Sequence, residues 1–194
     1  MFTTLIFDFG RVLFPNLSFI KKQNPEKFRK CKQVIIDLYP HIEACANLDK
    51  EQLKKLIFAY QSKDLLTKDR DAIYRSLVEI DKDVFGVIKT LSTKYTIVAL
   101  VNEAPKWTQV RRKLFSLDQY FKEYFVSSEI GLEKPNSKIF EFVLNKLNVQ
   151  ANKCLFVDDS EKNIEQAKRM GFGTVWYRNS QKVQKELREL LTCD

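Results

Sequence analysis

The chain has 194 residues, a length that suits one domain with a sizeable core or one domain that carries an insertion. Hydrophobic residues make up 44% and charged residues 30%, as in an ordinary globular protein, and no apolar run approaches the ~20 residues of a membrane-spanning helix. The formal net charge is +8, but the basic residues are dispersed, so we expect neither a nucleic-acid partner nor a membrane partner.

The N-terminus carries no basic segment of the kind that opens a secretory signal, and Asp8 interrupts its only apolar run. The four cysteines are widely spaced, form no Cys-x-x-Cys pair and have a single histidine to accompany them. We therefore expect no zinc set, reduced thiols and a cytoplasmic protein. These residues are Cys31, Cys45, Cys154, Cys193 and His41.

Residues 4–9 are predicted as the first strand, because the apolar run Leu5-Ile6-Phe7 leads into Asp8 and is typical of a strand buried on both faces of a sheet. The chain is then predicted to be almost entirely helical over residues 15–94. The first clear helix is expected to end near Pro40, because a proline disfavours helical geometry in the residue before it. Asp49 and Gln52 have the spacing of a capping box at the start of the next helix. The helices predicted here cover residues 27–38, the segment from Asp49 onward, 69–79 and 82–91.

From Tyr95 onward, apolar runs of strand type alternate with amphipathic helical patterns. This alternation predicts an α/β fold, a parallel sheet with helices on both faces. The first strand belongs to the same sheet, so a helical block is inserted between it and the rest. Strands are predicted at 95–101, 124–127, 154–157 and 174–177, and helices at 107–115, 137–147, 161–170 and 183–191.

Acidic residues follow two of the predicted strands. Asp8 ends the first strand, and Asp158 and Asp159 follow the strand at 154–157. Adjacent buried carboxylates repel one another unless a cation lies between them, and oxygen ligands of this kind favour Mg²⁺. The alternative is structural: Asp8 as a turn residue, and Asp158 or Asp159 as the cap of the helix that begins near Glu161.

Lys134 lies in a Glu-Lys-Pro-Asn segment just before a helix, where it could supply a positive charge to a phosphate. Taken alone it could equally be an ordinary surface lysine. Together with the acids it indicates a phosphoryl-transfer site, in which a carboxylate attacks phosphorus while a lysine and a magnesium ion neutralise the phosphoryl oxygens.

Four stretches in this order resemble the motifs of the haloacid dehalogenase superfamily of hydrolases, most of which are magnesium-dependent phosphatases. The resemblance spans residues 5–173, and its nearest branch is the small phosphatases whose first motif reads Asp-x-Gly. It implies a Rossmann-like core at residues 1–14 and 89–194 and a helical cap at 15–88. The stretches are LIFDFGRVLF, IVALVNEAP, SSEIGLEKPNSKIF and LFVDDSEKNIEQAKRMGF.

Carried over position by position, the resemblance implies that Asp8 is the nucleophile and that Lys134 stabilises the phosphoryl group and orients Asp8. It implies that Asp158, supported by Asp159, binds Mg²⁺ together with Asp8 and the backbone carbonyl of Gly10. Two further positions match supporting residues of the family: Asn102 follows the second-motif hydroxyl position, and Asn163 supports the loop of the fourth motif.

The sequence departs from the family pattern at two positions. Gly10 stands where an Asp usually acts as general acid and base, and Val101 stands where Ser or Thr usually contacts a phosphate oxygen. Asn102 could donate an amide hydrogen to the phosphate instead, and Glu103 is an acid at the same strand end. Arg11 could reach the phosphate, pair with Glu103 or point outward.

We therefore expect a magnesium-dependent phosphatase that acts on a small phosphorylated metabolite through an aspartyl-phosphate on Asp8. The alternative is a catalytically weakened relative that binds a phosphorylated ligand or partner without efficient turnover. Dehalogenation is not expected, because Gly10 does not match that branch. The protein is expected to be a monomer or a homodimer.

Overall fold

The structure, a computed structural model, describes residues 1–45, 48–62 and 64–192. The chain divides into two compact units, each assembled from separate stretches. The sheet unit comprises Met1–Leu13, Ile80–Glu103 and Asp118–Asp194, and the helical unit comprises Phe14–Glu79 and Ala104–Leu117. That residues 15–88 act as a cap stays a prediction.

Five parallel strands form one sheet in the order β3-β2-β1-β4-β5. The most N-terminal strand, β1, is therefore central, and the strand order reverses direction between β1 and β4. Open α/β sheets bind ligands at such a reversal, outside the carboxyl ends of the strands. The strands are β1 (Thr4–Phe7), β2 (Thr96–Val101), β3 (Glu123–Val126), β4 (Cys154–Asp158) and β5 (Gly173–Trp176).

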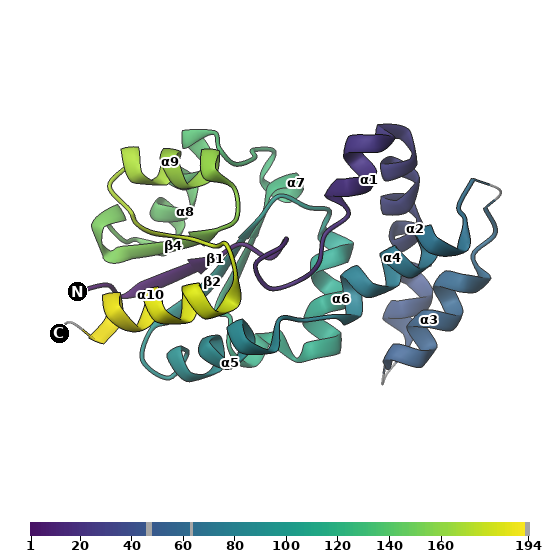
Figure 1. The fold of residues 1–194 in the computed structure, drawn as a ribbon, viewed down its shortest axis with the longest axis horizontal. Helices are drawn as coiled ribbons and strands as arrows, with labels where there is room; N and C mark the ends of the chain where they lie inside the picture. Colours follow the sequence, from purple (N-terminus) through teal and green to yellow (C-terminus); the bar gives the residue numbers. More distant parts are fainter. Residues whose placement is uncertain (46–47, 63, 193–194) are drawn as a thin grey trace. The chain divides into compact units, whose positions relative to one another are not determined.

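Helices cover both faces of this sheet, as the alternating sequence pattern predicts (Figure 1). Under one face, Ile6 of β1 and Phe156 of β4 pack in one cluster with Phe140 and Ile164 from two of the helices. All four side chains are almost completely buried, which explains why the strands read as continuous apolar runs. In Figure 1, α8 and α9 lie on one face, and α5 and α10 on the other. The helices are α5 (Lys82–Leu91), α7 (Ser127–Ile130), α8 (Ser137–Leu147), α9 (Glu161–Arg169) and α10 (Ser180–Thr192).

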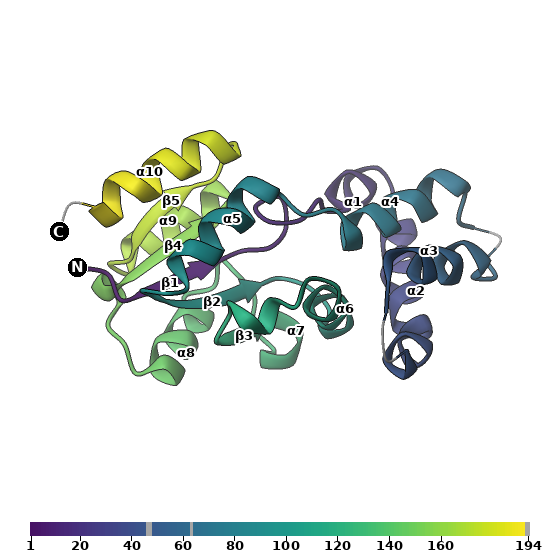
Figure 2. The same ribbon diagram turned by 90° about the horizontal axis from the view of Figure 1, so that it is seen from below.

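The helical unit has its own apolar core, to which two separate chain segments contribute. Leu53 and Ile73 pack there with Trp107 and Val110, which come from beyond the second strand of the sheet. In Figure 2, α3 and α4 lie side by side. The helices are α1 (Ser18–Gln23), α2 (Pro25–Ala44), α3 (Lys50–Ala59), α4 (Thr67–Val78) and α6 (Pro105–Phe115). Two short 3₁₀ turns, Leu117–Gln119 and Ala151–Lys153, complete the secondary structure.

The predicted end of the first long helix near Pro40 is wrong, because α2 continues through Pro40 to Ala44. Buried Leu38 and Ile42 flank the proline and keep the apolar face of the helix in the core of the helical unit. This packing outweighs the backbone hydrogen bond that a proline cannot donate. The predicted capping box of α3 is confirmed, since Asp49 and Gln52 exchange both of its hydrogen bonds.

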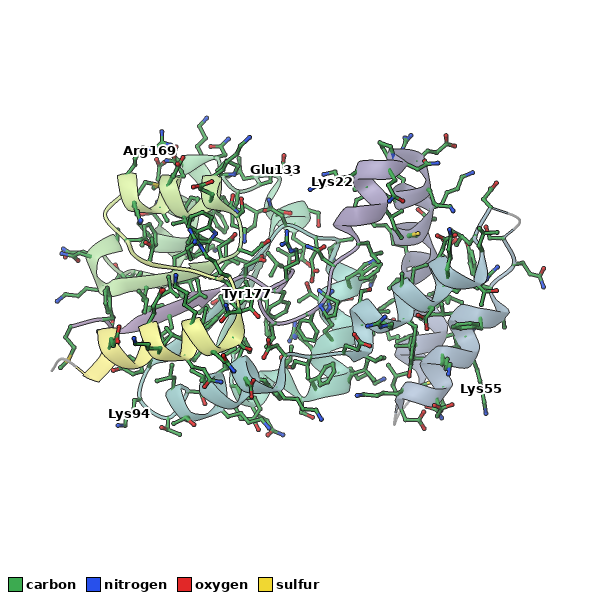
Figure 3. All side chains as sticks on the ribbon, in the orientation of Figure 1. Lys22, Lys55, Lys94, Glu133, Arg169 and Tyr177 are labelled. Carbon is green, nitrogen blue, oxygen red and sulfur yellow. The ribbon has the colours of Figure 1, made fainter. Side chains whose placement is uncertain are left out.

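Most of the charged side chains in the described ranges lie on the surface, with Asp8, Lys134 and Asp158 among the buried exceptions. Lys55, Lys94 and Arg169 extend away from their helices or loop in Figure 3. None of the helices in the described ranges combines the length and the apolar character that crossing a membrane requires. Among the described cysteines, Cys31, Cys45 and Cys154 carry free thiols. Cys193 lies outside the described residues.

Candidate active site

Polar side chains meet where the three central strands end. Residue Phe7 of β1 is in register with Ala99 of β2 and Val157 of β4, so Asp8 and Asp158 emerge at the same edge of the sheet. Because these strands are parallel, residues far apart in sequence converge there. One carboxylate oxygen from each of Asp8, Asp158 and Asp159 lies within 4.8 Å of the others.

Lys134 is held at the centre of this group. Its ammonium donates hydrogen bonds to Asp8 Oδ1 at 2.7 Å, to Asp158 Oδ2 at 2.7 Å and to the Leu100 carbonyl at 2.6 Å. An ammonium has three N–H groups, so the three bonds use all of its donors. The Lys134 side chain is only 1% exposed, and the structural alternative of an ordinary surface lysine is therefore wrong.

Asp158 is completely buried, and its carboxylate accepts hydrogen bonds from three neighbouring residues. Its Oδ1 accepts from the Ser160 N–H at 2.8 Å, and the Asn163 amide lies 3.0 Å from both carboxylate oxygens. Lys134 supplies the remaining hydrogen bond. Asn163 thus contacts the acid at the end of β4 and supports the loop that follows it, as the resemblance implied.

The electrostatics of the site are set by burial. The pKa of Asp8 is raised from 3.8 to about 7, mainly by burial; Lys134 opposes this rise, and the charges of Asp158 and Asp159 add to it. Burial and the charge of Asp158 also raise the pKa of Asp159, which Arg11 opposes. Burial alone lowers the pKa of Lys134, but the two carboxylates outweigh it and the pKa is raised. The site therefore holds more negative charge than its lysine balances.

Asn102 contacts Lys134 through the backbone. The Asn102 amide nitrogen donates to the Lys134 carbonyl at 2.9 Å, and its oxygen accepts from the Lys134 N–H at 3.0 Å. This two-point contact ties the end of β2 to the segment before α8. One amide hydrogen remains for a ligand, so the phosphate contact of Asn102 stays a prediction. In the sequence, the signal for this residue was an asparagine directly after a predicted strand. Its contact with the backbone of Lys134 was not predicted.

Arg11 follows Asp8 in a tight turn and pairs with Asp159, with 3.2 Å between Arg11 Nη1 and Asp159 Oδ2. The sequence offered Glu103 as its partner, which is not the acid that Arg11 contacts. Two groups that the family usually has are absent here. Gly10 has no side chain and so supplies no acid, and the buried Val101 at the end of β2 offers no hydroxyl.

Residues 5–177 match the model of the family described as haloacid dehalogenase-like hydrolase. The chain belongs to this family. The four stretches on which the resemblance to this family was based all lie within the matched residues. The roles of the individual residues in this hydrolase remain proposals.

The chain spans only 16% to 38% of the length of several curated relatives that it matches, but nearly the whole length of another. The chain is 25% identical to the D-ribitol-5-phosphate phosphatase of Bacteroides thetaiotaomicron over 98% of its own length and 99% of that protein. Over 46% of its length it is 28% identical to the rat bifunctional epoxide hydrolase 2, of which it spans only 16%. Among solved structures, a predicted HAD-like family hydrolase from Porphyromonas gingivalis has a TM-score of 0.66 and 25% identity, with 100% of both chains covered.

The carboxylates of this hydrolase suit a divalent cation. Three acids offer oxygen ligands close together, and burial first, then the charges of Asp158 and Asp159, raise the pKa of Asp8. Hard oxygen donors of this kind favour magnesium over softer metals, and magnesium is commonly held by only one or two carboxylates. The donor set therefore fits a magnesium ion.

Proposed function

We propose that this hydrolase is a magnesium-dependent phosphatase that acts on a small phosphorylated metabolite, with Asp8 as nucleophile. The observation that carries the proposal is the convergence of Asp8, Asp158 and Asp159 around the Lys134 ammonium at the carboxyl edge of the sheet. A nucleophile, a fixed cation and a set of oxygen ligands are the parts that phosphoryl transfer requires.

In the first step, a carboxylate oxygen of Asp8 forms a bond to phosphorus while the bond from phosphorus to the ester oxygen breaks. The product on the protein is an aspartyl-phosphate, and the alcohol leaves. Lys134 holds Asp8 Oδ1 at 2.7 Å, which orients the carboxylate and favours its charged form against the effect of burial. In the second step, water attacks phosphorus, inorganic phosphate leaves, and the Asp8 carboxylate is regenerated.

Asp8, Asp158 and Asp159 would hold the metal, together with the Gly10 carbonyl that the family resemblance implies. When bound, magnesium supplies positive charge that neutralises the phosphoryl oxygens. Around it, Asn163 and the Ser160 N–H keep Asp158 in place, so this ligand is ordered before any ion binds.

Gly10 has consequences for the departing alcohol. Without a carboxylic acid at this position, the leaving oxygen takes its proton from water, and the loss of general acid catalysis typically costs 10²–10⁴-fold in rate. We therefore propose that turnover is fastest on esters whose leaving group needs little protonation. The second candidate function, a ligand-binding protein with slow turnover, rests on this same departure and on Val101.

A relative matched over nearly its full length supports a substrate class for the proposal. The protein matched over 99% of its length is a D-ribitol-5-phosphate phosphatase, whose substrate is a small polyol phosphate. We propose that this chain also acts on the terminal phosphate of a small sugar or polyol.

The test is phosphate release from a panel of phosphomonoesters, with polyol and sugar phosphates and an aryl phosphate, in Mg²⁺ and in EDTA. Asp8→Asn should abolish release, while Asp64→Asn, the same change at an exposed surface residue, should leave it intact. Equal rates for wild type and Asp8→Asn contradict the proposal. Tight binding of phosphate without release of any product supports the ligand-binding alternative instead.

A further inference from the structure

Arg11 occupies an unusual backbone position immediately beside the site. Its φ is 62°, in the left-handed region that residues with a side chain rarely adopt. The turn that contains it is closed by a hydrogen bond of 2.9 Å from the Leu13 N–H to the Phe9 carbonyl. Strained residues of this kind concentrate at functional sites, where the side chain is put to use.

The Arg11 side chain is aimed at the acids. Its guanidinium lies 3.2 Å from Asp159 Oδ2, yet the side chain is 61% exposed, and Asp159 is 18% exposed. An exposed ion pair of this sort contributes little to stability and can exchange partners at small cost. A guanidinium has five N–H donors in a planar fork, so several of them remain for another anion.

The site needs a charged donor for phosphate that its other residues do not readily supply. The three donors of Lys134 are used by Asp8, Asp158 and the Leu100 carbonyl. Val101 has no hydroxyl, and Asn102 has already committed one amide hydrogen to the Lys134 carbonyl. The hydrogen that Asn102 retains is neutral, whereas a charged donor forms a hydrogen bond to phosphate about twice as strong.

We propose that Arg11 is the phosphate clamp of this site, and that it exchanges Asp159 for a phosphate oxygen when Mg²⁺ takes the Asp159 carboxylate. The inference rests on the proposed function, since it assigns the donor that binds the phosphate group of the same substrate. In the metal-free state, Arg11 is the cation that neutralises Asp159. When Mg²⁺ and phosphate are bound, Asp159 coordinates the metal and Arg11 binds the phosphate.

This exchange predicts that replacing Arg11 weakens phosphate binding without weakening Mg²⁺ binding. In Arg11→Gln, Mg²⁺ alone should bind as tightly as in wild type or more tightly, because Asp159 has lost a competing cation. Inorganic phosphate, measured at saturating Mg²⁺, should bind about tenfold more weakly, because a charged donor is missing. A purely structural Arg11 that only held Asp159 in place would instead weaken Mg²⁺ binding.

The experiment measures both constants by titration calorimetry on the full chain, first with Mg²⁺ alone and then with inorganic phosphate at saturating Mg²⁺. Arg11→Lys keeps the charge but loses the fork, so its phosphate affinity should lie between those of wild type and Arg11→Gln. Arg169→Gln is the matched control, because Arg169 forms a similarly exposed ion pair, with Glu165, at the far end of α9. Circular dichroism confirms that each variant is folded.

Phosphate affinity in Arg11→Gln within twofold of wild type overturns the proposal, as does a parallel loss of Mg²⁺ and phosphate binding. Either result leaves the proposed phosphatase intact if wild type releases phosphate and Asp8→Asn does not. If wild type neither binds nor releases phosphate, both proposals are wrong.

Discussion

Replacing Lys134 by methionine tests whether the central ammonium holds the site together. The change preserves most of the side-chain volume but removes a cation bonded to two carboxylates whose exposed fractions are 11% and 1%. Removing one partner of a buried ion pair typically costs about 3–5 kcal/mol, because the other charge stays buried without compensation. We expect a loss of this size in the free energy of unfolding of metal-free protein, a large part of the ~5–15 kcal/mol that a domain usually has.

Urea denaturation at pH 7.5 in EDTA measures this loss, with an unchanged m-value as the sign that folding stays two-state. Lys138→Met is the matched control, because Lys138 is exposed in the first turn of α8, and it should change stability by no more than about 0.5 kcal/mol. The double variant Asp8→Asn/Lys134→Met removes one of the stranded charges and should recover part of the loss. A cost below about 1 kcal/mol for Lys134→Met, or a double variant less stable than Lys134→Met, refutes the reasoning.

Three further predictions concern single positions. Asn102→Asp places a carboxylate against the Lys134 carbonyl in place of the donor at 2.9 Å, so the free energy of unfolding should fall by about 1–3 kcal/mol, and an unchanged denaturation midpoint contradicts this. Ser116 ends α6 with φ 49° and ψ 43°, so Ser116→Gly should raise stability by about 1 kcal/mol, whereas Ser92→Gly, at a helix end with φ −62°, should not. Burial raises the pKa of Asp8 to about 7, so the folded metal-free protein holds this proton more tightly than the unfolded chain. Its contribution to stability is therefore lost as the pH rises from about 4 to about 7, and thermal melts should show this loss in wild type but not in Asp8→Asn.

The fold was largely predictable because its apolar pattern is regular. The continuous apolar runs at the strands come from burial on both faces, and the alternation with helices predicted a parallel sheet. The helix predicted at 82–91 coincides with α5 (Lys82–Leu91). The prediction at Pro40 was wrong because it weighed a local preference alone, whereas the packing of Leu38 and Ile42 decided where α2 ends.

The candidate site was predictable in its acids and its lysine, because Asp8, Lys134 and Asp158 each follow a recognisable pattern at a strand or helix end. Their convergence is seen in the structure, while their chemical roles remain proposals. The Leu100 carbonyl was not predictable, since a backbone acceptor for a lysine leaves no mark on the side-chain sequence. The Asp159 partner of Arg11 was missed because it depends on a left-handed turn at a residue that usually avoids one.

The divided origin of the helical unit bears on how this protein can be re-engineered. Trp107 and Val110 of α6 belong to the same apolar core as Leu53 and Ile73, although the second strand of the sheet separates them in the chain. Excising residues 14–79 at two cut points would leave the apolar face of α6 bare, and a bare face of this kind invites aggregation. A graft that exchanges this unit between relatives must therefore carry α6 with it, as a module joined to its host at four points.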